Sequence, residues 1–336
     1  MKYLIPIAVM LSILTSSSYG KIRLATYNIN YSRSAENEWK WPERRDRVAD
    51  LIRKIDADVL ALQEVVKSSP ASTHDSELSF DDIEQTLNSQ GYEFFKAPFK
   101  TDREGVEQYL VSGIKKDKLN YESVRHLTYH LNEIIPVERS RIELGSVLVT
   151  ALKLNEETII IYNHHFPMSA EGRMVTAHGL GTLQKTVLKD LQIENDANFI
   201  TIHMGDFNSF PDDKGPEQVA SILKQGFTDA GIHARWSHLE VPVNDKISEK
   251  VSYTFVGFPH DVDRAAAKGI DFRSNEGHLD HIFLSNNASI VDGSVLVWNA
   301  DPLELTYNYK YWQGGGEFKS SIFPSDHLPM SVDLEL

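Results

Sequence analysis

Segments with the apolar pattern of buried strands alternate along this chain with segments whose apolar residues have helical spacing. Short apolar runs, rich in β-branched residues, predict strands over Lys21–Asn28, Asp58–Val65, Ser146–Leu154, Thr158–Tyr162, Asn198–His203, His278–Ser285 and Met330–Leu336. Antiparallel strands are also predicted between Gly105 and Arg141. Apolar residues at helical spacing predict helices after Pro42, over Leu78–Gln90 and over Gly172–Asp190. The mixture of strands and helices predicts an α/β fold.

The first twenty residues have a different character. Lys2 precedes an apolar run from Leu4 to Leu14, and the small residues Ser16 to Gly20 follow it. This order is typical of a secretory signal peptide, and the apolar run is too short to span a bilayer comfortably. We therefore expect residues 1–20 to be cleaved, in preference to a membrane anchor or a buried first helix. The mature protein is then expected to be secreted or periplasmic, from a bacterium.

The remaining chain, residues 21–336, contains no internal repeat and no low-complexity linker. We therefore expect a single domain, which is a monomer without an obligate protein partner. Residues 211–275 are rich in turn-forming and polar residues, and their length predicts a substrate-facing insertion of loops.

Composition narrows the range of functions. A hydrophobic content of 41% and an aromatic content of 10% argue against disorder. The formal net charge of −14 weighs against tight, non-specific binding of nucleic acid, but it is compatible with an enzyme that brings a cation to a phosphate. The chain has no cysteine, which excludes disulfides, thiolate metal sites and a cysteine nucleophile.

One loop organises the candidate site. Gly205 follows a predicted buried strand and can adopt backbone angles closed to other residues, so the chain can turn sharply there. Asp206 and Asn208 would then share one side, with Phe207 on the other. The carboxylate could hold a water or a cation, and the amide could donate to a phosphate oxygen. The alternative is an ordinary turn in which both side chains bond their own backbone.

Other polar residues also stand at or just after the ends of predicted strands, namely Asn28, Glu64, His165, Asp280, Asp326 and His327. In layered α/β folds such ends meet at one rim. Carboxylates, amides and histidines, without a serine or cysteine nucleophile in an elbow, suggest hydrolysis by activated water at a magnesium-type oxygen site. His164, next to His165, is a competing candidate for the second histidine.

Six phrases follow one another along the chain: Thr26-Tyr27-Asn28, Leu62-Gln63-Glu64-Val65, Asn163-His164-His165-Phe166, Gly205-Asp206-Phe207-Asn208, Leu279-Asp280-His281-Ile282 and Ser325-Asp326-His327-Leu328-Pro329. In this order they resemble the endonuclease/exonuclease/phosphatase superfamily, which includes deoxyribonuclease I, exonuclease III and neutral sphingomyelinases. The resemblance implies a four-layered α/β/β/α sandwich, in which two sheets pack face to face with helices outside. It also implies a metal-dependent phosphoesterase.

The resemblance further implies a metal site. Glu64 corresponds to the principal metal ligand of the family, and Asn28 and Asp326 are expected close to the ion. The expected cofactor is Mg²⁺, with Mn²⁺ or Ca²⁺ as alternatives.

The catalytic roles are implied in the same way. Asp206 is expected to orient or deprotonate the attacking water, and Asn208 to hold a phosphate oxygen. His327 corresponds to a catalytic histidine whose ring is oriented by Asp280. The second histidine of the family corresponds to His165.

A weaker resemblance concerns three supporting residues. Glu107, Gln108 and Tyr109 resemble the segment of the deoxyribonuclease I branch in which a glutamate supports the second histidine. Glu107 would then keep His165 protonated and suited to contact the phosphate. Arg141, or Arg139, would contact phosphate. The alternative is that these are solvated surface residues.

The substrate is left with three interpretations. A nuclease or phosphodiesterase that acts on nucleic acid or nucleotides is favoured. The second interpretation is a lipid or small-molecule phosphoesterase, for which Trp39 and Trp41 could line a pocket or touch a membrane, although they could equally be packing residues. The third, an inactive binding module, is disfavoured because every motif is intact.

Overall fold

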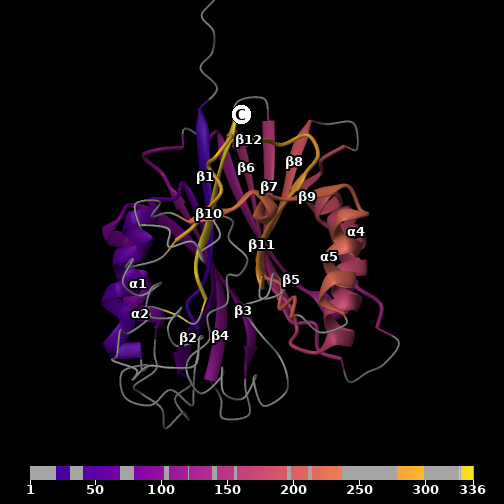
Figure 1. Cartoon of the computed structure of the whole chain (residues 1–336), viewed down its shortest axis with the longest axis horizontal. Coiled ribbons are helices and arrows are strands. Elements are labelled where there is room, and N and C mark those ends of the chain that lie inside the picture. The colour runs from indigo at the N-terminus through magenta and orange to yellow at the C-terminus, as the bar shows by residue number, and fades with distance from the viewer. Residues whose placement is uncertain are drawn as a thin grey trace, which may run out of the picture.

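Two β-sheets face each other in the computed structural model, and helices cover the outer face of each (Figure 1). The structure describes residues 20–30, 41–68, 79–101, 106–119, 121–137, 142–154, 157–194, 198–210, 214–236, 278–298, 325 and 327–335. The predicted four-layered α/β/β/α sandwich is therefore confirmed.

The first sheet is built around the parallel pair β1–β2, with antiparallel partners on both sides. Its strands in spatial order are β10 (Arg235–Trp236), β13 (Leu296–Val297), β14 (Met330–Glu335), β1 (Lys21–Asn28), β2 (Val59–Ser68), β4 (Val106–Lys115) and β3 (Tyr92–Thr101), and β12 (Ser289–Ile290) also pairs with β14.

The second sheet is built around the parallel pair β7–β8. Its strands in spatial order are β5 (Ser123–His130), β6 (Ser146–Leu154), β7 (Glu157–His165), β8 (Phe199–Asp206), β11 (Asp280–Ser285) and β9 (Phe227–Asp229). Strands β7 and β8 are buried over almost their whole length, as expected for central strands covered on both faces.

Helices α1 (Trp41–Ile55) and α2 (Phe80–Ser89) cover the first sheet, while α4 (Ala170–Leu191) and α5 (Gly215–Leu223) cover the second (Figure 1). The short helices α3 (Leu131–Ile134) and η3 (Ala230–His233) complete the described elements. Helix α1 buries Val48, Leu51, Ile52 and Ile55, which is the predicted apolar stripe. A separate apolar core, which includes residues of β1, β2, β7, β8 and β14, fills the space between the two sheets.

Part of the loop-rich prediction for residues 211–275 is wrong. Helix α5, strand β9 and helix η3 occupy residues 215–233. Helix α5 was missed because Gly215 and Pro216 at its start resemble a loop, although proline is well tolerated in the first turn of a helix. Residues 237–277 and the predicted signal up to residue 19 lie outside the described residues.

Within the described part of the chain, no helix combines the length and the apolar character needed to cross a membrane.

Candidate active site

The register of the second sheet places three candidate residues side by side. His165 at the end of β7 pairs with Asp206 at the end of β8, and Asp206 pairs with Asp280 at the start of β11. All three side chains are buried. The predicted convergence of strand ends therefore occurs within this sheet.

The first sheet supplies Glu64 from a β-bulge in β2. Leu62 pairs with Val111 and Val65 pairs with Tyr109, so two residues of β2 face a single residue of β4. Glu64 itself has a φ angle of 59°, a left-handed conformation that costs a non-glycine residue about 1 to 3 kcal/mol. The bulge turns Glu64 out of the regular strand alternation and toward the second sheet.

A buried polar network supports this bulge. The side-chain amide of Asn163, on β7, donates to the backbone oxygens of Leu62 and Val111 at 3.2 and 2.9 Å. Gln63 donates to Oδ1 of Asn163 at 2.8 Å and contacts Thr26. Because buried backbone oxygens without partners are costly, Asn163 stabilises the strand distortion that positions Glu64.

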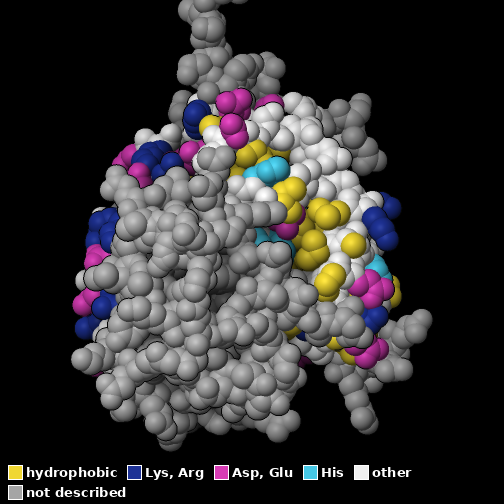
Figure 2. All heavy atoms as spheres, in the orientation of Figure 1, with side chains coloured by type: hydrophobic (Ala, Val, Ile, Leu, Met, Phe, Trp, Pro, Cys, Tyr) yellow, Lys and Arg dark blue, Asp and Glu magenta, His cyan; other side chains and the backbone are white. Residues whose placement is uncertain are grey.

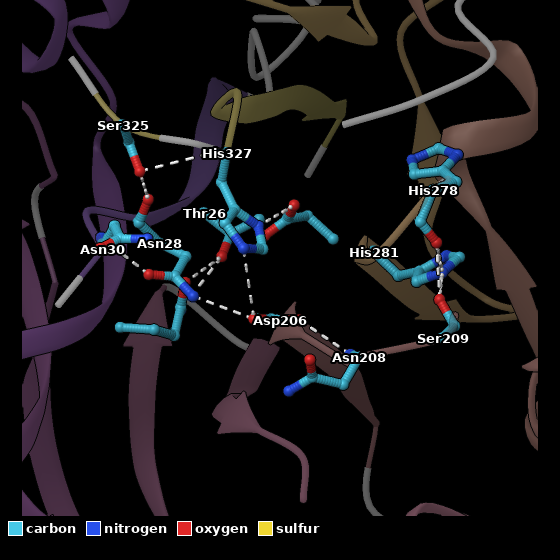
Figure 3. Close-up of polar contacts among 12 residues, drawn as sticks. Thr26, Asn28, Asn30, Asp206, Asn208, Ser209, His278, His281, Ser325 and His327 are labelled. Atoms are coloured by element: carbon cyan, nitrogen blue, oxygen red, sulfur yellow. Dashed lines mark hydrogen bonds and ion pairs between the residues drawn. The ribbon is translucent and has the colours of Figure 1, made fainter. Parts of the chain in front are cut away.

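Asn28 joins the two sheets at the site. Its Nδ2 donates to Oδ2 of Asp206 at 2.9 Å and to Oε1 of Glu64 at 3.1 Å (Figure 3). Its Oδ1 accepts the backbone N–H of Asn30 at 2.9 Å. Asn28 therefore lies against both carboxylates, and its position close to a bound metal ion stays a prediction.

Two imidazole rings flank the carboxylate of Asp206. Nε2 of His165 lies 3.5 Å from Oδ2 of Asp206, and Nε2 of His327 lies 3.8 Å from the same oxygen. Nε2 of His165 is also 3.6 Å from Oε1 of Glu64. Nδ1 of His327 lies 2.8 Å from Oδ2 of Asp280, which is the contact expected from the sequence.

Burial controls the charge of these groups. It raises the pKa of Asp206 to about 7, because a carboxylate is poorly solvated there. Burial also lowers the pKa of His165 to about 4, which keeps this ring neutral at pH 7.

The two adjacent histidines have different environments. His164 points into the core behind the second sheet, where its Nε2 lies 2.8 Å from Nδ1 of His203. Burial holds the pKa of His164 well below its ordinary value and lowers that of His203 to about 3. The structure therefore places His165 in the site and His164 in the core.

Gly205 lies near the end of β8, and Asn208 lies in the turn that follows this strand. Gly205 has a φ angle of 144°, and a Cβ atom there would overlap the backbone carbonyl of His164. The backbone N–H of Asn208 donates to Oδ1 of Asp206 at 2.7 Å, and its Nδ2 donates to the backbone oxygen of Phe166 at 2.8 Å. A side-chain amide has two N–H groups, so Asn208 keeps one donor for a ligand.

The predicted support of His165 by Glu107 is wrong. Glu107 instead accepts a hydrogen bond from the hydroxyl of Tyr109 at 2.6 Å, and Tyr109 packs against Phe80 of α2. Both residues therefore lie on the outer face of the first sheet, away from His165. Nδ1 of His165 has no hydrogen-bond partner among the described residues. The candidates Arg139, Arg141 and Asp326 lie outside the described residues.

A buried cluster that the sequence analysis missed lies beside Asn208. Oγ of Ser209 lies 2.8 Å from Nε2 of His281 (Figure 3). Nδ1 of His281 lies 2.8 Å from Oδ2 of Asp229. Nε2 of His281 also faces the backbone oxygen of His278 at 2.9 Å, and a carbonyl can only accept. The signal in the sequence was Ser209 directly after the Gly205–Asn208 phrase.

This cluster has the members of a nucleophilic triad but not its proton arrangement. Both nitrogens of His281 face acceptors, so the ring carries two protons and cannot deprotonate Ser209. Consistently, the pKa of His281 is raised: burial is the largest single influence and lowers it, but the charge and hydrogen bond of Asp229, together with the charge of Asp280, outweigh the burial. The cluster is therefore an ion pair that ties the Asn208 loop to β11.

The donor set fits a divalent cation. One oxygen each from Glu64 and Asp206 and one nitrogen from His165 lie within 4.8 Å of one another. No lysine or arginine among the described residues forms an ion pair with Asp206, which is almost completely buried. Buried carboxylates need compensation, and carboxylate oxygens are the ligands that magnesium prefers.

Comparison with known proteins decides the family. A profile of the endonuclease/exonuclease/phosphatase family matches residues 25–327. The chain belongs to this family. No curated protein matches the chain by sequence.

Solved structures of family members share the fold at low identity. A Bacteroides vulgatus endonuclease/exonuclease/phosphatase is 19% identical with a TM-score of 0.59, covering 94% of this chain and 99% of its own. A mannosyl-6-phosphatase from Bacteroides thetaiotaomicron is 17% identical with a TM-score of 0.58, and the match covers 94% of this chain and 100% of the other. Truncated TDP2 from Caenorhabditis elegans is 16% identical with a TM-score of 0.55, and the match covers 94% of this chain and 98% of the other.

Proposed function

We propose that this family member is a secreted, divalent-metal-dependent phosphoester hydrolase that acts on phosphodiesters of nucleotides or nucleic acid. The observation that carries the proposal is the carboxylate of Asp206, which lies between Nε2 of His165 and Nε2 of His327. Export is proposed from the signal-like residues 1–20.

The site residues fall into two groups: some can accept a proton from the attacking water, and others can donate hydrogen bonds to the phosphate. Asp206 and Nε2 of His327 can both accept a proton from an attacking water, and Asp280 stabilises the ring of His327 when it is protonated. Neutral His165 and the remaining N–H of Asn208 can donate to phosphoryl oxygens, where negative charge increases in the transition state.

The carboxylates of Glu64 and Asp206 would hold the metal ion. When bound, Mg²⁺ supplies Lewis-acid polarisation of a phosphoryl oxygen. Asn28 contributes by keeping the two carboxylates next to each other, because it donates to both. Replacement of Asn28 would leave them to repel each other.

A second candidate substrate is a phosphoester with an apolar leaving group, such as a phospholipid. Hydrophobic side chains gather beside histidine and acidic side chains on the face shown in Figure 2. Met168, only three residues after His165, is 71% exposed, which makes it the most exposed large hydrophobic among the described residues. The structural similarity to a mannosyl-6-phosphatase adds sugar phosphates to the substrates worth testing.

The proposal is tested by hydrolysis assays on the mature protein with Mg²⁺, with Mn²⁺ and with chelator. Plasmid DNA, RNA, bis-p-nitrophenyl phosphate, p-nitrophenyl phosphate, mannose 6-phosphate and sphingomyelin are compared side by side, and His327→Ala controls for contaminating enzymes. Metal-dependent cleavage of polynucleotides or of the diester supports the proposal. Turnover of sphingomyelin alone supports the second candidate, and inactivity on every substrate contradicts both.

A further inference from the structure

The edge strand of the first sheet carries a bulge next to the active site. In the pairing of β3 with β4, Pro98 faces Tyr109 and Lys100 faces Gln108, so Phe99 is an extra residue. A bulge of this kind changes which face of the sheet the following side chains occupy. The bulge therefore determines where Lys100 points.

The neighbouring strand identifies that face. Tyr109 packs against Phe80 of α2 and so lies on the outer face, which places Gln108 on the inner face, toward the second sheet. Residues directly opposite each other on paired strands share a face, so Lys100 also lies on the inner face. Lys96, before the bulge, lies on the outer face with its Nζ 4.1 Å from the Phe80 ring.

The extra residue contacts the catalytic centre directly. The ring of Phe99 stacks on that of His165, with 4.7 Å between ring centroids and 19° between planes. Gly145, with a φ angle of 75°, makes this possible, because a Cβ atom there would overlap the Phe99 ring. Nζ of Lys100 lies 5.7 Å from the centre of the same Phe99 ring. The ammonium group therefore lies near the aromatic ring that covers His165.

Electrostatics agrees with this placement. Lys100 is exposed and forms no ion pair with a described residue, whereas Lys115, Lys116 and Lys118 each pair with a carboxylate. In a protein with a net charge of −14, this is an available cation beside a site for phosphate.

We propose that Lys100 binds a second phosphate group of the substrate, adjacent to the phosphate contacted by His165 and Asn208. The inference rests on the proposed function and specifies its substrate class as compounds with two phosphates. Two sources supply such a pair: neighbouring phosphates of a nucleic acid strand, or a bisphosphorylated small molecule. The bulge at Phe99 is the structural device that brings the ammonium group to the active-site face.

Binding measurements test this without requiring turnover. Isothermal titration calorimetry, with Mg²⁺ in excess, compares thymidine 3′,5′-bisphosphate with thymidine 5′-monophosphate, and fructose 1,6-bisphosphate with fructose 1-phosphate. The mature protein should bind at least one bisphosphate about fivefold to tenfold more tightly than its monophosphate, as one exposed charge-assisted contact predicts. The pair that shows the preference identifies the source of the second phosphate.

Lys100→Ala should remove this preference and change monophosphate binding less than twofold. Lys96→Ala is the matched control on the same strand and opposite face, and it should keep the preference, as should Lys100→Arg. Equal binding of both ligands, no measurable bisphosphate binding, a preference that survives in Lys100→Ala, or its loss in Lys96→Ala would each overturn the proposal. A Lys100-dependent preference in a protein that hydrolyses no phosphoester would contradict only the proposed function.

Discussion

Asp280 holds His327 through a 2.8 Å contact to Nδ1, and this leaves Nε2 of the ring 3.8 Å from the carboxylate of Asp206. The two residues come from different sheets, since Asp280 begins β11 and His327 precedes β14. The contact with Asp280 therefore holds the His327 ring, which belongs to the first sheet, next to the carboxylate of Asp206 in the second sheet.

Asp280→Asn should lower kcat by about 10² to 10⁴, the range typical of losing an assisted proton transfer. Asparagine lacks the negative charge that stabilises the protonated ring, while the shape of the side chain is kept. Steady-state kinetics on the best substrate measures the effect. Asp292→Asn, an exposed residue in the loop after β12, should leave kcat unchanged. A kcat close to that of the unmodified protein in Asp280→Asn would contradict the role of this pair.

Glu64→Gln should raise the concentration of Mg²⁺ needed for half-maximal activity by at least about tenfold, because a neutral amide is a weaker ligand for a hard cation. The measurement is a titration of activity with Mg²⁺ in both proteins. Glu107→Gln is an informative comparison, because Glu107 lies on the outer face of the first sheet and bonds Tyr109. A shift of the Mg²⁺ titration in Glu107→Gln but not in Glu64→Gln would exclude the assignment.

Asp229→Asn should destabilise the protein by about 3 kcal/mol, because it leaves the buried, doubly protonated ring of His281 without its counter-charge. Denaturation with urea gives the free energy of unfolding. Asp50→Asn changes an exposed carboxylate of α1 and should fall within about 0.5 kcal/mol of the unmodified protein. A similarly small change in Asp229→Asn would show that the ring is neutral and that the hydrogen-bond assignment is wrong.

The buried His164 and His203 predict a loss of stability in acid. The folded state lowers the pKa of His203 to about 3, whereas the unfolded value is about 6.5. Above pH 6.5 both rings are neutral in the folded and the unfolded protein, so they cost no stability. As the pH decreases from 6.5 toward 3, the unfolded protein binds protons that the folded protein does not. The free energy of unfolding therefore falls by about 1.4 kcal/mol per pH unit for each histidine.

His203→Gln removes one of these two titrating groups while it keeps a hydrogen-bonding side chain next to His164. The free energy of unfolding, measured between pH 7 and pH 5, should therefore fall less steeply in this variant than in the unmodified protein. Identical slopes would mean that His203 becomes protonated without unfolding the protein.

The sequence predicted the strand end and turn that carry Asp206 and Asn208, because the information for them is local. An apolar strand, then Gly205, then Asp206 and Asn208 specify a strand end and a turn without reference to the rest of the chain. The helices and central strands were predictable for the same reason. That two sheets pack face to face was expected only from the resemblance of the ordered motifs to a known family.

The failures concern information that depends on strand pairing. Glu107 was assigned to the wrong face because no pattern in the sequence shows the face on which a strand begins. The bulges at Glu64 and Phe99 were missed because an extra residue becomes visible only against the partner strand. His281 and Asp229 are 52 residues apart, so their ion pair depends on the placement of β9 beside β11.

Asn28 makes the two sheets share a single hydrogen-bonded group, because one nitrogen donates to Glu64 on the first sheet and to Asp206 on the second. A small sliding of one sheet over the other would separate these carboxylates while both sheets kept their own ladders. We therefore expect the hydrolytic activity to be lost at a lower temperature than the secondary structure that circular dichroism measures.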